Sequence, residues 1–501
     1  MVTIREWMNN KTILITGGAG FFGKVLTEKL LRTCPGVKRI YLIIRPKRGK
    51  TPQERWDEIA KDALFETVLA DTPDIIDQKV TVLDGDMSLI NLGLSQEIIE
   101  ELQNTVNIIF HSAATVRFND PLHKAFLSNT RGTLEMCKLA SEANNLEVFV
   151  HVSTAYCNHN LKLTCYEEKV YEPYQNWRTI LKLIETENPV VMNTISYKII
   201  QDHPNTYTFS KSLGEKIVEE YSCKFPTVIA RPTVVVGILK GPNPGWTDNL
   251  NGVFGITTAC GKGVMRVIKG NEECCLDYIP VDYAINALIS SGWEKASGEN
   301  KELSIYNCSY SNLLPTFSLK VLYDQGSEVN KKECTLDNDI WYPFLIFATN
   351  DIYFHFLFYV FQVIPAVFLD SILFLINKKR RLIKLNIKIY QALQALSPFT
   401  TKNVQFDNTK YKALWNKLSQ DEAEIYPVRP PSDFNWREVI LIMHKGVKKY
   451  FLKEYLEDEE YHRKKLMRLY YLHQFAKGII ISATFMLSYK LINGSIYRYI
   501  L

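Results

Sequence analysis

A tyrosine and a lysine four residues apart, Tyr207 and Lys211, are the residues of this chain best suited to exchange a proton with a substrate oxygen. At this spacing two side chains lie on one face of a helix. A buried ammonium beside the phenol would lower the phenol pKa and let Tyr207 act near neutral pH. A hydroxyl of Thr154 or Ser153 would complete the oxygen-binding site. The pair alone is common by chance, so its meaning depends on its surroundings.

A glycine-rich stretch near the N-terminus supplies those surroundings. It follows an apolar run at 12–15 and leads into an amphipathic run at 24–31, which predicts a strand, a turn and a helix. Such a turn binds a dinucleotide pyrophosphate against the free N–H groups of the helix. A glycine turn without a ligand is the alternative. The expected cofactor contacts are Thr16, Gly17, Gly18, Gly20, Phe21, Phe22 and Gly23.

The end of the second predicted strand, at 39–44, indicates which dinucleotide binds. An acidic residue there would bond the ribose 2′-hydroxyl of NAD. This chain instead has Arg45 followed by Lys47 and Arg48, and cations suit a 2′-phosphate. We therefore expect NADPH, with Arg45 and Arg48 as its contacts. A solvated basic loop is the alternative.

Four further apolar runs read as strands, at 80–83, 107–110, 148–152 and 228–230. Further candidates stand directly after them: Asp86 and Met87, Ala113 and Ala114, Ser153 and Thr154, Arg231 and Pro232. The carboxyl ends of parallel strands are where open α/β sheets bind ligands. Asp86 and Met87 would contact the adenine, and the two alanines would leave room for the cofactor, unless they are only packed small residues. A helix is expected from about residue 129.

Composition narrows the remaining possibilities. The chain has 501 residues, too many for one average domain, with 46% hydrophobic and 23% charged residues. Its net charge of +5 is spread along the chain, which does not favour nucleic acid as a partner. The ten cysteines form no CxxC pair, so we expect no metal site and a reducing compartment. No signal peptide is expected before the first strand.

The segment 341–377 contains neither lysine nor arginine and is largely apolar. Its length could cross a bilayer, but Pro365 and Asp370 make one straight span costly. We therefore weigh a span against a hairpin in one leaflet and against a buried hairpin of a soluble domain. The basic run 378–381 would lie on an anionic cytoplasmic surface.

A second membrane candidate is the segment 470–495, a C-terminal anchor in which Lys477 and Lys490 could snorkel. The basic run 462–465 before it places the preceding chain in the cytosol. The endoplasmic reticulum is the first expectation and the peroxisomal membrane the second, although the chain does not end in Ser-Lys-Leu.

Taken together, these motifs resemble the fatty acyl-CoA reductases, the male-sterility type of the extended short-chain dehydrogenase/reductase superfamily. The resemblance covers about residues 10–455 and also draws on the block Pro244–Trp246. It implies an α/β fold, a Rossmann-like doubly wound parallel sheet with a smaller substrate-binding part and a C-terminal helical, membrane-associated domain. The expected parts are a reductase domain at 1–340 with its substrate-binding part at about 235–340, a hydrophobic hairpin or span at 341–377, and a helical domain at 355–455.

The resemblance also implies a reaction. Long-chain fatty acyl-CoA would accept hydride from NADPH, release CoA and pass through an aldehyde to a primary alcohol, with Tyr207 as the proton donor. Lys262 and Arg266 are candidates for the CoA phosphates. Two alternatives stay open: a related dehydrogenase acting on a nucleotide sugar or hydroxysteroid, and a non-catalytic NADP-binding scaffold. Chain-length preference and oligomeric state are left undetermined.

Overall fold

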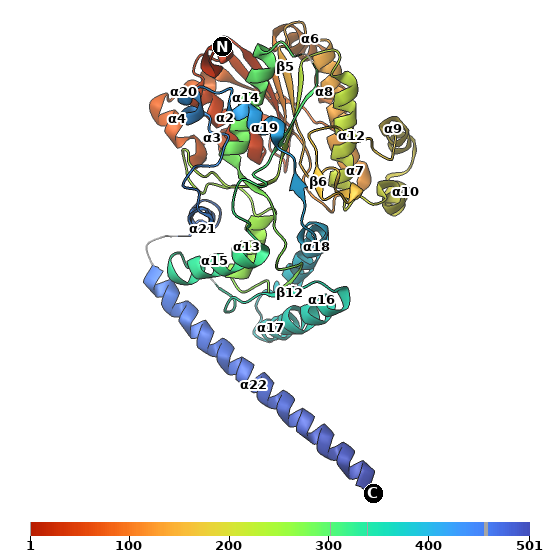
Figure 1. Ribbon diagram of the computed structural model, residues 1–501, viewed down its shortest axis with the longest axis vertical. Coiled ribbons are helices and arrows are strands. Elements are labelled where there is room, and N and C mark those ends of the chain that lie inside the picture. The colour runs from red at the N-terminus through yellow and green to blue at the C-terminus, as the bar shows by residue number, and fades with distance from the viewer. Residues whose placement is uncertain (1, 301, 338, 455–458, 501) are drawn as a thin grey trace.

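The computed structural model describes residues 2–300, 302–337, 339–454 and 459–500, without the side chains of 487 and 490–500. Its centre is a seven-stranded sheet in the order β11-β7-β5-β4-β1-β2-β3 (Figure 1). Every neighbouring pair in this sheet is parallel. The strands are β1 (Thr12–Thr16), β2 (Arg39–Ile44), β3 (Val80–Asp84), β4 (Ile108–His111), β5 (Val148–Val152), β7 (Thr227–Pro232) and β11 (Ser304–Cys308).

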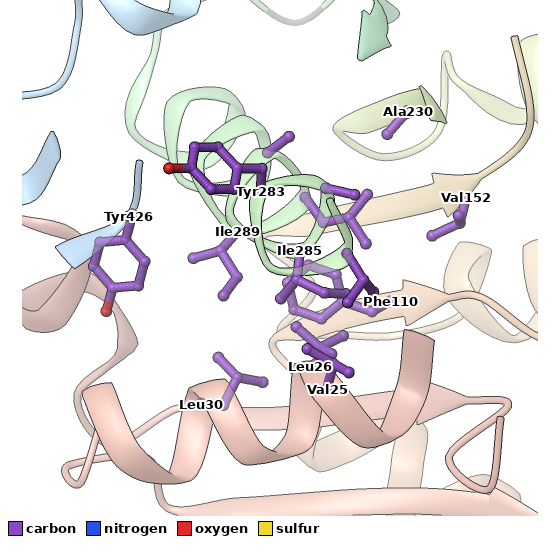
Figure 2. Close-up of a cluster of buried hydrophobic side chains, with 14 of the residues drawn as sticks. Val25, Leu26, Leu30, Phe110, Val152, Ala230, Tyr283, Ile285, Ile289 and Tyr426 are labelled. Carbon is purple, nitrogen blue, oxygen red and sulfur yellow. The ribbon is translucent and has the colours of Figure 1, made fainter. Parts of the chain in front are cut away.

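Helices cover both faces of this sheet, because each strand turns alternate apolar side chains to opposite sides. Ile13 and Ile15 join a core with α2 (Phe21–Thr33) and α14 (Val281–Ser297). Leu14 joins a second core with α8 (Gly132–Ser141) and α12 (Thr206–Tyr221). Figure 2 shows the first core, where Leu26 and Leu30 of α2 lie near Ile285 and Ile289 of α14. The expected doubly wound sheet is confirmed.

The C-terminal segment contributes to the first core. Tyr426 packs there with Leu30 and Ile289 (Figure 2), and its hydroxyl lies 3.1 Å from the Cys34 thiol of the chain's first βα unit. Tyr411 of α19 (Thr409–Trp415) is fully buried in the same cluster. The segment 355–455 is therefore joined to the reductase domain by a shared core.

The apolar segment forms one continuous helix, without the turn at Pro365 that either of the two hairpin alternatives would need. Its consecutive parts are α16 (Asp351–Phe358), a π turn η5 (Tyr359–Val363) and α17 (Ile364–Leu375). A proline removes one backbone donor and crowds the preceding turn, and the wider π turn just before Pro365 accommodates it. Among the described residues, this 25-residue helix is the one with the length and apolar composition to cross a membrane.

Two long helices, α18 (Leu382–Thr400) and α22 (Glu459–Ile500), also belong to the C-terminal part. Helix α18 follows α17, and its first N–H groups, from Arg381 to Ile383, donate to the Asp370 carboxylate. Helix α22 runs away from the body (Figure 1). Its first half is held by a hydrogen bond between Trp341 and His473, whereas Phe475 and the apolar side chains up to 486 are exposed. The rest of the anchor expected at 470–495 includes side chains outside the described residues.

Candidate active site

The turn between β1 and α2, together with the start of α2, leaves no room for a side chain at two of its glycines. Gly17 has φ +74°, and a Cβ there would lie 2.9 Å from the Ala113 backbone. A Cβ on Gly23 would lie 2.3 Å from the Gly17 carbonyl oxygen. Helix α2 begins directly afterwards at Phe21, so its first N–H groups have no partner within the helix. This cradle fits a dinucleotide pyrophosphate.

Two of the expected cofactor contacts face the protein instead. Thr16 is fully buried; its hydroxyl lies 2.8 Å from His111 Nδ1 and accepts from the Ala113 N–H. It holds the end of β4 beside β1 and so positions Ala113. Gly18 is buried against Leu42. Phe21, Phe22 and Ala114, by contrast, line a cavity.

A group of cations surrounds the loop after β2. One Arg45 nitrogen lies 3.6 Å from Asp86, and Arg48 sits in the adjoining turn. The group also contains Arg55 of α3 (Pro52–Ala60) and Arg117. Partial burial and the charges of these four arginines lower the pKa of Lys47. Clustered cations of this kind suit an anionic ligand.

Sequence reasoning missed Arg55 and Arg117 because neither stands at a motif position. Arg55 lies ten residues beyond Arg45, and the turn of α3 brings its guanidinium onto the Arg45 carbonyl. Arg117 lies in the loop after β4, where the sequence carries no signal for a cofactor contact. Met87, the other adenine candidate, is buried, and its backbone packs on Gly132.

The proton-exchange candidates meet at a cavity of about 570 Å³. Helix α12 carries Tyr207 and Lys211 on the wall of this cavity, and the segment after β5 adds Ser153 and Thr154. Pro232 also lines it. The cavity therefore lies at the carboxyl edge of the sheet, next to the glycine turn, as the spacing of the motifs indicates.

The electrostatics differ from the expected pairing. Burial raises the pKa of Tyr207, and a hydrogen bond with Thr154 acts in the opposite direction. Lys211 is aimed elsewhere: its ammonium donates to the Val152 carbonyl at 2.7 Å. Burial lowers the pKa of Lys211 to about 8. In this arrangement Thr154, rather than Lys211, is the group that favours the ionised phenol.

The helix before the site begins earlier than expected. It starts with α7 (Leu122–Phe126), passes through a π turn η3 (Leu127–Arg131) and continues as α8. The π turn places Asn129 inward, where its amide donates to Ser210 at 2.9 Å and to the Thr115 carbonyl. Asn129 thereby fixes α12 against the loop after β4, which positions Tyr207.

Arg231 does not reach the cofactor cleft, so its expected role there is corrected. Its side chain is 2% exposed and donates to Glu215 at 2.8 and 2.6 Å. Further donors go to the carbonyls of Glu167 and Lys169. The Asn307 side-chain oxygen, 3.5 Å from Nη1, is a fifth acceptor. A guanidinium engaged by five oxygens in the interior has no donor left for a ligand.

The two cations expected at the CoA phosphates are also engaged. Lys262 donates to Glu454 at 2.6 Å and to the Asp337 carbonyl. Arg266 is buried and donates to the carbonyls of Gly263 and Phe361. Both hold the C-terminal part of the chain in place. Among the described residues, the cations that line the catalytic cavity are Lys211, Arg117 and Lys388.

The C-terminal part closes one side of the cavity. Helix α18 supplies a row of wall residues: Lys388, Gln391, Ala392, Ala395, Leu396, Phe399 and Thr400. A second cavity, of about 110 Å³, shares Phe254, Ile256 and Tyr278 with the first and is lined mostly by apolar side chains. Its walls come from α13 (Val253–Gly261), α15 (Leu319–Lys332) and α21 (Trp436–Gly446).

Comparison with solved structures agrees with this architecture. The terminal R domain from the myxalamid PKS-NRPS biosynthetic pathway has a TM-score of 0.59 and 19% identity, covering 89% of this chain and 92% of that chain. The reductase domain of a nonribosomal peptide synthetase from Mycobacterium tuberculosis has a TM-score of 0.58 and 16% identity, covering 88% and 92%. At these identities the likeness shows the fold alone.

Family models described as "Male sterility protein" match residues 15–288 and 361–454. Fatty acyl-CoA reductase 1 of Gallus gallus is 34% identical over 94% of this chain and 90% of its own length. Fatty acyl-CoA reductase 2 of Mus musculus is 35% identical over 96% and 93%. Fold and matches together define an oxidoreductase with a nicotinamide cofactor. The chain belongs to the fatty acyl-CoA reductase family.

The corrected position of Arg231 leads to a stability prediction. Arg231→Leu would leave the Glu215 carboxylate buried without its partner, so we expect the free energy of unfolding to fall by about 3–5 kcal/mol. Arg178→Ala is the control, because its pair with Glu220 is exposed and contributes less than about 1 kcal/mol. Chemical denaturation of both variants measures the difference. Equal losses would contradict the structural role of Arg231.

Proposed function

We propose that this protein reduces long-chain fatty acyl-CoA to a primary fatty alcohol with NADPH. The observation that carries the proposal is the position of Tyr207 and Thr154 on the wall of a cavity that adjoins a second, largely apolar one. A reacting carbonyl can sit at the two hydroxyls while its alkyl chain extends into apolar surroundings. The names of the relatives support the same substrate class.

The cation cluster supports NADPH as the cofactor. The 2′-phosphate would lie among Arg45, Arg48 and Arg55, with Lys47 and Arg117 close by. Cations of this number favour a phosphate dianion over a neutral ribose hydroxyl. The glycine cradle would hold the pyrophosphate. When bound, NADPH supplies the hydride, and two molecules in turn supply the two hydrides that a thioester needs to become an alcohol.

The residues of the chain would act on the substrate oxygen. In the first reduction, the Tyr207 and Thr154 hydroxyls donate hydrogen bonds to the developing oxyanion; the hemithioacetal then collapses and releases CoA. In the second reduction, Tyr207 gives its proton to the alkoxide. Tyr207 is protonated at neutral pH, since burial raises its pKa, and an alkoxide is basic enough to take its proton. Lys211 holds this edge of the site through the Val152 carbonyl and would face the nicotinamide ribose.

Membrane attachment belongs to the same proposal. We place the protein on a membrane with its catalytic domain in the cytosol, where NADPH and acyl-CoA are available, on the endoplasmic reticulum first and the peroxisome as the alternative. The exposed apolar residues of α22 up to 486 support attachment.

Product analysis tests the reaction. Membranes carrying the protein are incubated with NADPH and acyl-CoAs of mixed chain length, and the lipids are resolved by gas chromatography. We expect a primary alcohol, and we expect none from Tyr207→Phe, which lacks the proton donor but keeps the phosphate cradle and should still bind NADPH. Alcohol formation by the variant at the normal rate would remove Tyr207 from this role. Aldehyde alone would assign the second reduction to another enzyme.

Cofactor choice is tested at Arg45. Removal of one charge-assisted contact costs about 1.5–3 kcal/mol, so Arg45→Ala should raise the KM for NADPH roughly 10- to 100-fold. The KM for NADH should stay nearly constant. Lys50→Ala is the control, since Lys50 lies in the same loop but pairs with Glu58. Initial rates with both cofactors measure the effect, and parallel changes for NADPH and NADH would contradict the assignment.

Chain-length preference is tested at Gly326, a helical residue on the wall of the second cavity. A Cβ at this position would meet no atom within 4 Å, so larger side chains can enter the cavity without displacing backbone. Gly326→Phe should shift the products to shorter chains, because the end of the acyl chain loses its space. Gly326→Ala is the control for the change in helix propensity. An unchanged product spectrum in Gly326→Phe would place the acyl chain elsewhere.

A further inference from the structure

The helix formed by α16, η5 and α17 has one side turned to the protein and one side exposed. The exposed side is almost wholly apolar, with Ile352 82% exposed, Phe368 64% and Leu375 80%. Its other large exposed residues follow helical spacing: Tyr353, Phe356, Tyr359, Ile364, Val367, Ile372 and Phe374. A contiguous face of this kind is a sign of a partner or a membrane.

Three polar side chains of the segment contact the rest of the protein and fasten the helix along its length. Near its start, Asp351 pairs with Lys269 of β9 (Val267–Lys269). In the middle, the Gln362 side chain is buried; it accepts from the backbone N–H groups of Arg266 and Val267 and donates to Asn386. Towards its end, Asp370 caps α18.

These fastenings argue against a transverse orientation. A helix that crossed the bilayer would carry β9 and the start of α18 into the hydrocarbon with it, including Arg266 and Arg381. Polar and charged groups at that depth are costly. A helix lying in the plane of one leaflet exposes only its apolar side to lipid and leaves the fastened side with the protein.

The charge around this face fits an anionic leaflet. Lys378, Lys379, Arg380 and Arg381 follow the apolar helix, with Lys384 and Lys388 on α18, and all six are exposed. Within the described part of the chain, none of the six pairs with a carboxylate of another residue. Juxtamembrane cations are attracted to anionic headgroups.

Helix α18 links this face to the catalytic cavity. Residues four apart lie in rows along a helix. One row runs through Ile383, Ile387, Gln391 and Ala395, and the next through Lys384, Lys388, Ala392 and Leu396. Both rows are exposed in the first half of α18 and line the cavity from Lys388 or Gln391 onward. Figure 1 shows α18 between the sheet and the pair α16 and α17.

We propose that the apolar face from Ile352 to Leu375 lies in the plane of one anionic leaflet, and that fatty chains move between this leaflet and the catalytic cavity along α18. The second half of the proposal rests on the proposed function, since it concerns the fatty substrate and product. The first half rests only on the exposed face, its inward polar groups and its basic border.

Depth measurements test the first half. Single variants Phe356→Trp, Ile364→Trp and Phe374→Trp of the full chain are bound to phosphatidylcholine–phosphatidylserine vesicles, and quenching by lipids labelled near the headgroup or near the acyl end is compared with the parent chain. At all three positions we expect the label near the headgroup to quench the fluorescence of the added tryptophan more strongly than the label near the acyl end does. Tyr197→Trp, on the exposed helix α11 (Ser196–Ile200), is the control and should not be quenched. Stronger quenching of Ile364→Trp by the deep label would show a span and overturn the proposal, as would no quenching at all.

The movement of fatty chains along α18 is tested with Ile387→Glu. This change puts a charge on the row of residues that runs from Ile383 to the cavity. We expect slower turnover of long-chain acyl-CoA presented on vesicles, with unchanged turnover of a short, water-soluble acyl-CoA. Val190→Glu is the control, because Val190 is an exposed apolar residue outside α18. It should change neither the long-chain nor the short-chain turnover. Equal long-chain rates in Ile387→Glu and the parent would overturn the path. Absence of all acyl-CoA turnover in the parent would count against the proposed function and leave the depth result standing.

Discussion

The close approach of backbone to backbone at the first βα turn is the constraint on which the rest of the site depends. Gly17 faces the Ala113 backbone and Gly23 faces the Gly17 carbonyl at distances that exclude any Cβ. This contact brings the N-terminus of α2 to the edge of the sheet, and Thr16 joins β1 to the end of β4 through His111. The hydroxyls on the cavity wall are thus held at fixed positions relative to the glycine turn, the place where a dinucleotide binds in this type of fold.

Buried polar side chains fix the position of α12 against the sheet and the loop after β4. Arg231 and Glu215 tie β7 to α12 in the interior, and Asn129 in its π turn ties α12 to the loop after β4. A buried ion pair of this kind contributes little net stability but is costly to break. Its effect here is to keep the helix that carries Tyr207 in one register against the sheet, which the proposed role of the Tyr207 hydroxyl would require.

The C-terminal part is more than an attachment. It enters the core through Tyr411 and Tyr426, closes the cavity through α18, and carries the apolar helix on the far side of α18. Helix α18 therefore lines the cavity at one end and borders the exposed apolar surface at the other. For the fatty substrate proposed above, this arrangement would keep the alkyl chain in apolar surroundings between membrane and cavity.

The sequence by itself determined the strands, the glycine turn, the helix with Tyr207 and Lys211, and the basic loop after β2, because these depend on local periodicity and on short fixed spacings. Only the tertiary structure showed that Arg231 pairs with Glu215, that Lys211 faces Val152, and that Arg55 and Arg117 join Arg45, since these contacts link residues whose separation carries no local signal. The same holds for the helix at Pro365. The sequence shows a proline and an aspartate in an apolar run, whereas the structure shows a π turn before the proline and a role for Asp370 as the cap of α18. Partners distant in the chain decide whether a polar residue interrupts a helix or fastens it.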